Sequence, residues 1–255
     1  MNNKRNLLKL AAAITVMGAA GLPAYAQAQE VVKIGLILPM TGPFASPGRR
    51  TQAPARLYMA QHGSTVAGKK IELIVRDDAS VADTTKRMAQ ELVVNDKVNV
   101  LAGFGLTPLA LSTAPIATQA KVPMVVMAAG TAMITEQSPY IVRTGFTLPQ
   151  ATLGIAQWAP KNGIKKVVTL VSDYGPGIDA QDSFKKVFTA GGGTIAEEIR
   201  VPVRNPDFAP FLQRVRDAKP DAVFVFVPSG VGAAFMKQFT ERGLDKAGIK
   251  LIGTG

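Results

Sequence analysis

The residues of this chain that could do chemistry stand where apolar runs end, and the clearest case is residues 170–179, LVSDYGPGID. Such an elbow suits a nucleophile turn, a phosphate cradle or the wall of a binding cleft. Ser172 is not in a G-x-S-x-G context, and the glycines lack the Lys and Ser/Thr partners of a phosphate loop. We therefore interpret the elbow as a cleft wall. Tyr174 would offer a ligand its ring face and its hydroxyl, while Asp173 could support the next helix or contact the ligand.

Residue types that catalysis or metal binding requires are scarce. The chain has no cysteine and one histidine, His62. The absence of cysteine excludes thiol nucleophiles, disulfides and Cys-based zinc sites. His62 stands in a polar turn, which is typical of a surface residue. A catalytic triad that uses a histidine would have to use this one. We therefore expect no catalytic residue, no metal and no cofactor, although chemistry by carboxylates alone, at Asp77, Asp78 or Asp173, stays open.

A second candidate site follows the apolar run 98–103. Thr107 stands before Pro108, which predicts a helix with Thr107 as its cap and Pro108 as its first residue. The backbone N–H groups of Leu109 and Ala110 would then point outward at the positive end of the helix, a natural seat for a carboxylate. The Thr107 hydroxyl could cap the helix and hold a ligand, because a hydroxyl both donates and accepts.

Two further loops complete the set of candidates. After the run 124–127, small residues such as Ala128 and Gly130 allow close backbone approach, and Thr131 can donate a hydrogen bond. Tight packing against a neighbouring strand explains the same residues. The loop at 39–50 is rich in Gly and Pro and is either a solvated loop or a cleft wall; it bears Phe44, Ser46, Arg49 and Arg50.

These loops belong to an alternating series of strands and helices. The strand patterns are near-continuous apolar runs, typical of strands buried on both faces. They lie at residues 31–38, 71–75, 98–103, 124–127, 167–171, 222–227 and 249–253. Helical patterns lie between them, among others at 80–93, 178–190, 205–218 and 230–242. The alternation predicts an α/β fold with parallel sheets and right-handed crossovers. Such sheets bind ligands beyond the carboxyl ends of their strands.

The spacing of the series predicts two lobes, an N-terminal lobe at 31–146 and a C-terminal lobe at 147–255. The last strand pattern, 249–253, has no helix after it. A parallel strand without its crossover leaves apolar surface bare, so we expect the C-terminal lobe to be incomplete and the chain to be part of a longer protein. An edge strand at a natural end is the alternative.

The first 26 residues have the pattern of a secretory signal peptide. A basic start is followed by the uncharged stretch 10–22 and by Ala24-Tyr25-Ala26, which fits the small-x-small cleavage rule. The stretch is short for a membrane span, although an uncleaved anchor is the competing interpretation. We expect export to the periplasm.

The formal net charge of +11 at pH 7 is scattered along the chain. No run of Lys and Arg alternates with aromatic residues, so we expect no nucleic-acid partner. A positive surface fits a small acidic ligand.

Taken together, the motifs resemble the leucine/isoleucine/valine-binding family of periplasmic solute-binding proteins, which serve ABC importers. The resemblance covers nearly all of 31–255 in the order of the family. It is carried by VKIGLILPMTGPFA, VNVLAGFG with LALSTAPIA and KVPMVV, SPYIVRT, VVTLVSDYGPG, and NPDFAPFLQRVRDAKPDAVFVFV. It implies two doubly wound parallel-sheet lobes (the type I periplasmic binding protein fold), joined by three crossovers, the last of which is absent here.

The resemblance also implies a ligand site between the lobes. It places the hydroxyl that holds a ligand carboxylate on Thr107, a backbone contact on Ala128 and an aromatic contact on Tyr174. A family Thr falls on Gly130, with Thr131 adjacent, which puts that contact in doubt. The acid that grips an ammonium group in amino-acid binders would fall at or past Gly255.

Some of the motifs look similar to family members that handle aromatic carboxylates, namely AAGTAMIT, SPYIVRT and SDYGPGID. The first-lobe loops offer no obvious acid for an ammonium group. We therefore predict a periplasmic solute-binding component of an ABC importer, not an enzyme. It would capture a branched-chain or related amino acid or an aromatic acid, and deliver it to a membrane permease. The alternative is an exported α/β enzyme that acts on a small carboxylate.

Overall fold

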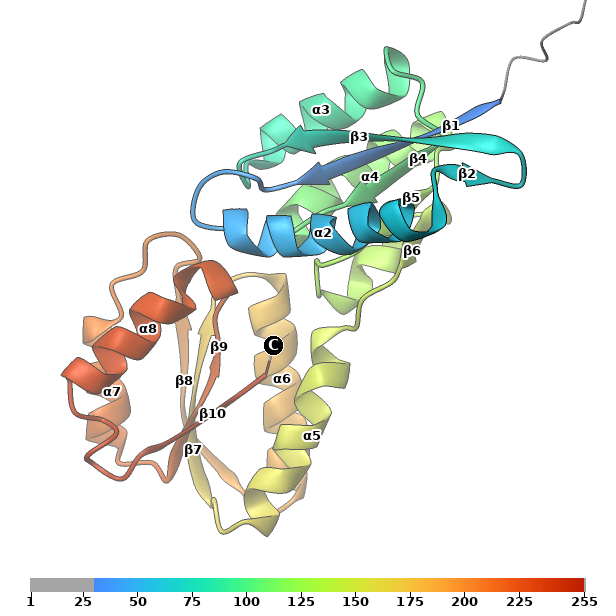
Figure 1. Ribbon diagram of the computed structural model, residues 1–255. Helices are drawn as coiled ribbons and strands as arrows, with labels where there is room; N and C mark the ends of the chain where they lie inside the picture. Colours follow the sequence, from blue (N-terminus) through green and yellow to red (C-terminus); the bar gives the residue numbers. More distant parts are fainter. Residues whose placement is uncertain (1–29, 255) are drawn as a thin grey trace, which may run out of the picture. The chain divides into compact units, whose positions relative to one another are not determined.

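Two sheets organise the protein in the computed structural model, which describes residues 30–254 (Figure 1). The signal segment expected at 1–26 lies outside these residues. All strand pairs are parallel except the short pair of β2 and β3. No helix within 30–254 has both the length and the apolar character needed to cross a bilayer.

The first sheet has the strand order β2-β3-β1-β4-β5-β6. Its strands are β1 (Val31–Leu38), β2 (Thr65–Val66), β3 (Lys69–Asp77), β4 (Val100–Gly103), β5 (Met124–Val126) and β6 (Ile141–Arg143). The central strand β1 pairs with β3 on one side and β4 on the other, so that Ile34 stands between Leu73 and Val100. Apolar residues on both faces of β1 are therefore covered, as its continuous apolar run predicts.

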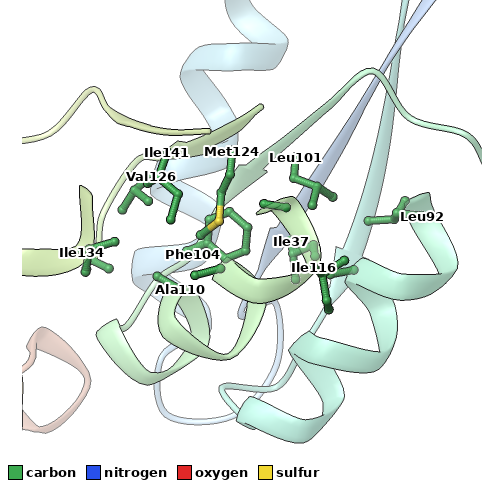
Figure 2. Close-up of a cluster of buried hydrophobic side chains, with 14 of the residues drawn as sticks. Ile37, Leu92, Leu101, Phe104, Ala110, Ile116, Met124, Val126, Ile134 and Ile141 are labelled. Carbon is green, nitrogen blue, oxygen red and sulfur yellow. The ribbon is translucent and has the colours of Figure 1, made fainter. Parts of the chain in front are cut away.

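Helices cover both faces of the first sheet. On one face lie α3 (Ala82–Val94) and α4 (Thr107–Ala120), followed by the short 3-10 helix η1 (Ala132–Gln137) after β5. Figure 2 shows the core on this face, in which Leu92 of α3 and Ile116 of α4 pack with Ile37 of β1 and Phe104. The helix α2 (Ala45–His62) lies along the other face and buries only Ala45 and Gly48.

The second sheet has the order β10-β9-β7-β8 and is also covered on both faces. Its strands are β7 (Lys166–Ser172), β8 (Thr194–Val201), β9 (Ala222–Phe226) and β10 (Lys250–Gly253). Its helices are α5 (Leu148–Lys161), α6 (Gly175–Ala190), α7 (Ala209–Ala218) and α8 (Ser229–Glu241). Figure 1 shows α5 and α6 on one face and α7 and α8 on the other, and two separate cores correspond to these layers.

Two local expectations from the sequence are wrong. The loop predicted at 39–50 is shorter, because α2 begins at Ala45. The start of α2 has no helical apolar period and contains Pro and Gly, so the sequence did not indicate a helix there. The helix expected to have Asn205 as its cap and Pro206 as its first residue begins at Ala209 instead. Asn205 has a φ of 46°, in the left-handed region, and not the extended backbone that is typical of a helix cap.

The order of the strands reverses at one place in each sheet, and this determines where a ligand can bind. In the first sheet β1 stands between β3 and β4, and in the second β7 stands between β8 and β9. Loops that leave neighbouring strands in opposite directions open a crevice at their carboxyl ends. The segments that follow β1, β4, β7 and β9 are thus the natural walls of a site.

Candidate ligand-binding site

A cavity of about 470 Å³ lies at these strand ends. Its volume falls within the range of small-molecule sites, roughly 300–1,000 Å³. Every lining residue comes from α2 or from a segment at the carboxyl end of β4, β5, β6, β7 or β9. The residues are Pro47, Arg50, Thr51, Gly105, Leu106, Thr107, Met127, Ala128, Ala129, Gly130, Gly145, Phe146, Leu148, Tyr174, Pro176 and Phe226. An adjoining cavity of about 310 Å³ shares several of these residues, Tyr174 and Phe226 among them.

The structure brings together the five residues that the sequence indicated. Thr107, Ala128, Gly130 and Tyr174 line the cavity. Thr131 does not line it but lies directly behind Thr107: the two hydroxyl oxygens are 2.8 Å apart, and both side chains are buried. The packing interpretation and the ligand interpretation of this loop are therefore compatible.

The cap expected at the start of α4 is wrong. Thr107 is the first residue of the helix, Leu106 is the cap position, and no side chain caps the helix. The N–H groups of Leu109 and Ala110 donate to the Leu106 carbonyl oxygen, at 3.1 and 3.3 Å, so they are not free for a carboxylate. The positive end of the α4 dipole still faces the cavity through Leu106 and Thr107.

Gly130 packs closely against the first turn of α5. A Cβ at this position would overlap Cδ2 of Leu148, the buried first residue of α5. A threonine at 130 would require the Leu148 side chain to move, and the hydroxyl of the loop stands at Thr131 instead. The neighbouring Ala128 is exposed to the cavity.

An aromatic pair also lines the cavity. Tyr174, at the start of α6, stacks on Phe226 at the end of β9, with ring centroids 6.3 Å apart and ring planes 17° from parallel. Both rings line the cavity. Tyr174 is half-buried, and burial raises the pKa of its phenol well above the usual range. The phenol therefore stays neutral and can act as a hydrogen-bond donor.

The Gly-Pro-Gly of the elbow after β7 allows α6 to begin close to two other segments. A Cβ at Gly177 would overlap the Ser172 carbonyl oxygen, and one at Gly175 would overlap Oγ1 of Thr131. The Asp173 side chain is 60% exposed, and its carboxylate lies 3.9 Å from the guanidinium of Arg200. Asp173 does not line the cavity, which leaves Tyr174 as the elbow's contribution.

Several residues of the site carried no strong sequence signal. Phe226 is the last residue but one of an apolar strand pattern. Arg143 and Asp179 lie in the motifs SPYIVRT and SDYGPGID, but the sequence pattern indicated no role for either charge. Arg143 donates to the carbonyl oxygens of Ala129 and Thr131, and Asp179 accepts from the N–H of Ala132. Only contacts between distant segments reveal these roles.

The acids Asp77 and Asp78 and the histidine that the sequence offered for catalysis lie away from the cavity. Asp77 accepts hydrogen bonds from the N–H groups of Met40 and Ala79, and Asp78 is fully buried and accepts from Ser80 and Thr85. His62 is exposed, with Nδ1 3.1 Å from the carbonyl oxygen of Tyr58. None of these side chains lines the cavity. Within the described part of the chain, no cluster of His, Cys, Asp or Glu is arranged to hold a metal ion.

Known proteins share this architecture. A family model described as periplasmic binding protein matches residues 31–255. The Leu/Ile/Val-binding protein homolog 6 of Brucella melitensis biotype 1 is 45% identical over 246 residues, which are 95% of this chain and 63% of that protein.

Two solved structures are similar along most of the chain. The solute-binding protein of an ABC transporter from Rhodopseudomonas palustris BisB5, in complex with 3,4-dihydroxybenzoic acid, is 68% identical with a TM-score of 0.85, over 88% of this chain and 61% of that one. An R. palustris solute-binding protein in complex with 4-hydroxybenzoate is 45% identical with a TM-score of 0.86, over 89% and 62%. The chain thus spans less than two thirds of the length of these relatives.

Proposed function

This chain belongs to the periplasmic binding protein family, and on that premise we propose that it binds a small aromatic carboxylate and presents it to the membrane permease of an ABC importer. The family and the α/β fold with parallel sheets, both expected from the sequence, are confirmed. We further propose that residues 31–146 and 147–255 act as two lobes that close on the ligand, a common transition in binding proteins.

The observation that carries the proposal is the chemistry of the cavity wall. The stacked rings of Tyr174 and Phe226 offer a flat apolar surface on which an aromatic ring can lie. Aromatic pairs of this kind contribute about 0.5–1.5 kcal/mol beyond the area they bury. An aliphatic side chain would use this surface less well.

The polar groups suit a carboxylate at the other end of the ligand. The cavity is lined by Thr107, which bears a hydroxyl, by Leu106 at the positive end of α4, and by Arg50, which bears a guanidinium group. None of the lining residues within 30–254 is acidic, so an α-ammonium group has no partner among them. Among these residues the ammonium group of an amino acid finds no opposite charge, whereas benzoate and its hydroxylated relatives carry only the negative one.

The relatives support the same ligand class. The two solved solute-binding proteins described above hold hydroxybenzoates. The Brucella relative carries an amino-acid binding name, which makes leucine the necessary comparison ligand. For delivery to the periplasm we propose that residues 1–26 act as a signal peptide.

Isothermal titration calorimetry with the protein tests the proposal. We expect 3,4-dihydroxybenzoate or 4-hydroxybenzoate to bind at least tenfold more tightly than leucine, a difference of about 1.4 kcal/mol. Tyr174→Ala should weaken the binding of the aromatic acids and should affect any binding of leucine less. Preference for leucine over every benzoate would assign the cavity to an amino acid, and turnover of a bound acid would favour the enzyme alternative.

A further inference from the structure

Two charged side chains hold the backbone of residues 129–132, which run from the cavity wall after β5 to the first residue of η1. The guanidinium of Arg143, the last residue of β6, donates from Nη1 to the Ala129 carbonyl oxygen and from Nη2 to that of Thr131, both at 2.5 Å. The carboxylate of Asp179 on α6 accepts the N–H of Ala132 at 2.7 Å. The segment is therefore fixed on both sides of Thr131.

The two charges act on the segment from different layers of the molecule. Arg143 belongs to the first sheet, whereas α6 covers the second sheet, so the bond from Ala132 to Asp179 joins elements of the two. Burial lowers the pKa of the Arg143 guanidinium, and the negative charge of Asp179 counteracts this shift. The two charges therefore attract each other across the segment. The planar fork of arginine suits two carbonyl oxygens at once, which lysine cannot reproduce.

The start of α6 also touches the Thr131 side chain, since Gly175 has no room for a Cβ against Oγ1 of Thr131. That oxygen is the partner of the Thr107 hydroxyl, at 2.8 Å. Each hydroxyl has one proton. When Thr131 donates to Thr107, the proton of Thr107 is left for a ligand in the cavity. The position of Thr131 thus determines where the Thr107 hydroxyl can direct its proton.

We propose that Arg143 and Asp179 are positioning residues for ligand binding, which fix Thr131 so that the Thr107 hydroxyl faces the ligand carboxylate. The inference rests on the proposed function and deepens it, because neither charged side chain lines the cavity. It assigns part of the affinity for a carboxylate to a residue on α6 that reaches the ligand only through two threonines.

A double-mutant cycle with 4-hydroxybenzoate as the probe tests this relay. Asp179→Asn should weaken binding about fivefold to tenfold, because the neutral amide is a weaker acceptor for the Ala132 N–H. In a Thr107→Val background the same change should have little further effect, since the relay ends at the missing hydroxyl. Asp182→Asn is the matched control: it removes the same charge from the exposed side of α6 and should leave affinity unchanged. Undiminished affinity in Asp179→Asn, or effects that simply add in the double variant, would overturn the proposal.

A second measurement needs no ligand and separates this inference from the proposed function. Hydrogen exchange of a peptide that spans residues 129–134 should be faster in Asp179→Asn than in Asp182→Asn, because the Ala132 amide loses its charged acceptor. If the wild type binds leucine and no benzoate, the function proposed above fails, and the same cycle run with leucine decides the relay. Unchanged exchange overturns the relay whatever the ligand.

Arg143→Lys provides an independent variant, since it keeps the charge but can serve only one carbonyl oxygen well. It should weaken 4-hydroxybenzoate binding in the same way and also lose that effect in the Thr107→Val background. If Arg143→Lys does not fold, the Asp179→Asn results decide alone.

Discussion

The hydroxyl oxygens of Thr107 and Thr131 lie 2.8 Å apart in the interior, although 24 positions separate the two residues in the sequence. One belongs to the start of α4 and the other to the loop after β5. Because β4 and β5 are parallel neighbours, their carboxyl ends meet at one edge of the sheet and bring the hydroxyls together. The pair links the packing of the loops to the chemistry of the cavity.

Removal of one hydroxyl of this pair should cost more stability than removal of both. Thr131→Val leaves the buried Thr107 hydroxyl without its partner, and we expect the free energy of unfolding to fall by about 1–2 kcal/mol. The double variant with Thr107→Val has no orphaned polar group and should lie within about 1 kcal/mol of the wild type. Urea denaturation measures both. Costs that add in the double variant would show that the hydroxyls are not coupled.

Gly130→Ala should destabilise the protein by about 1–3 kcal/mol, because its Cβ overlaps the Leu148 side chain and overpacks the junction with α5. The matched control is Gly154→Ala within α5, where a Cβ meets nothing within 4 Å. There we expect a gain of roughly 0.5–1 kcal/mol from helix propensity. Thermal melts compare the two. An equal response at both sites would contradict the packing explanation.

The buried phenol of Tyr174 should make the free energy of unfolding fall in alkaline solution. Burial raises the pKa of its phenol in the folded protein, so the folded state holds the proton more tightly than the unfolded one. The resulting stabilisation is complete below a pH of about 10 and is lost as the pH rises beyond it. Tyr174→Phe should therefore lose less stability than the wild type between pH 9 and 11 in urea melts.

Tyr58→Phe is the control for this experiment, because its ring is 59% exposed. It should follow the wild type at every pH. A Tyr174→Phe variant that follows the wild type as well would show that the phenol of Tyr174 ionises normally.

The carboxylate of Asp221 should make the free energy of unfolding fall in acid. Hydrogen bonds from the N–H groups of Lys165 and Lys166 lower the pKa of its carboxyl. A lowered pKa contributes stability above the pH at which an ordinary Asp ionises, about 4, and that contribution is lost as the pH falls further. Asp221→Asn should thus be less stable than the wild type at pH 7 and should approach it at low pH. A constant difference across this range would argue against the charge.

Much of the fold could be predicted because the strands are buried on both faces. The run at 31–38 coincides with β1. The run at 167–171 is one residue shorter than β7 at each end, and the run at 222–227 is one residue longer than β9. Burial on both faces requires an unbroken apolar run, which is visible in a sequence. By contrast α2 buries two small residues and leaves no such pattern.

The site could be predicted only in part, for a related reason. Thr107, Ala128 and Tyr174 follow directly after strands, where the topology of parallel sheets places ligands. Arg143 and Asp179 act through hydrogen bonds to backbone groups of another segment. Because nearly every residue has the same backbone groups, the residue types in a sequence do not show which of them will be bonded. The helix cap assigned to Thr107 failed because Thr107 is itself the first helical residue, one position past the cap, and its hydroxyl pairs with that of Thr131.

Phe226 belongs to two environments at once, and this has an evolutionary consequence. It packs in the core between the second sheet and α5 and α6, and it also lines the cavity. A substitution there that changes ligand preference also removes a core ring, which commonly costs several kcal/mol. Phe146 lines the same cavity but is 60% exposed. We expect descendants of this protein to explore new ligands through position 146 long before position 226 changes.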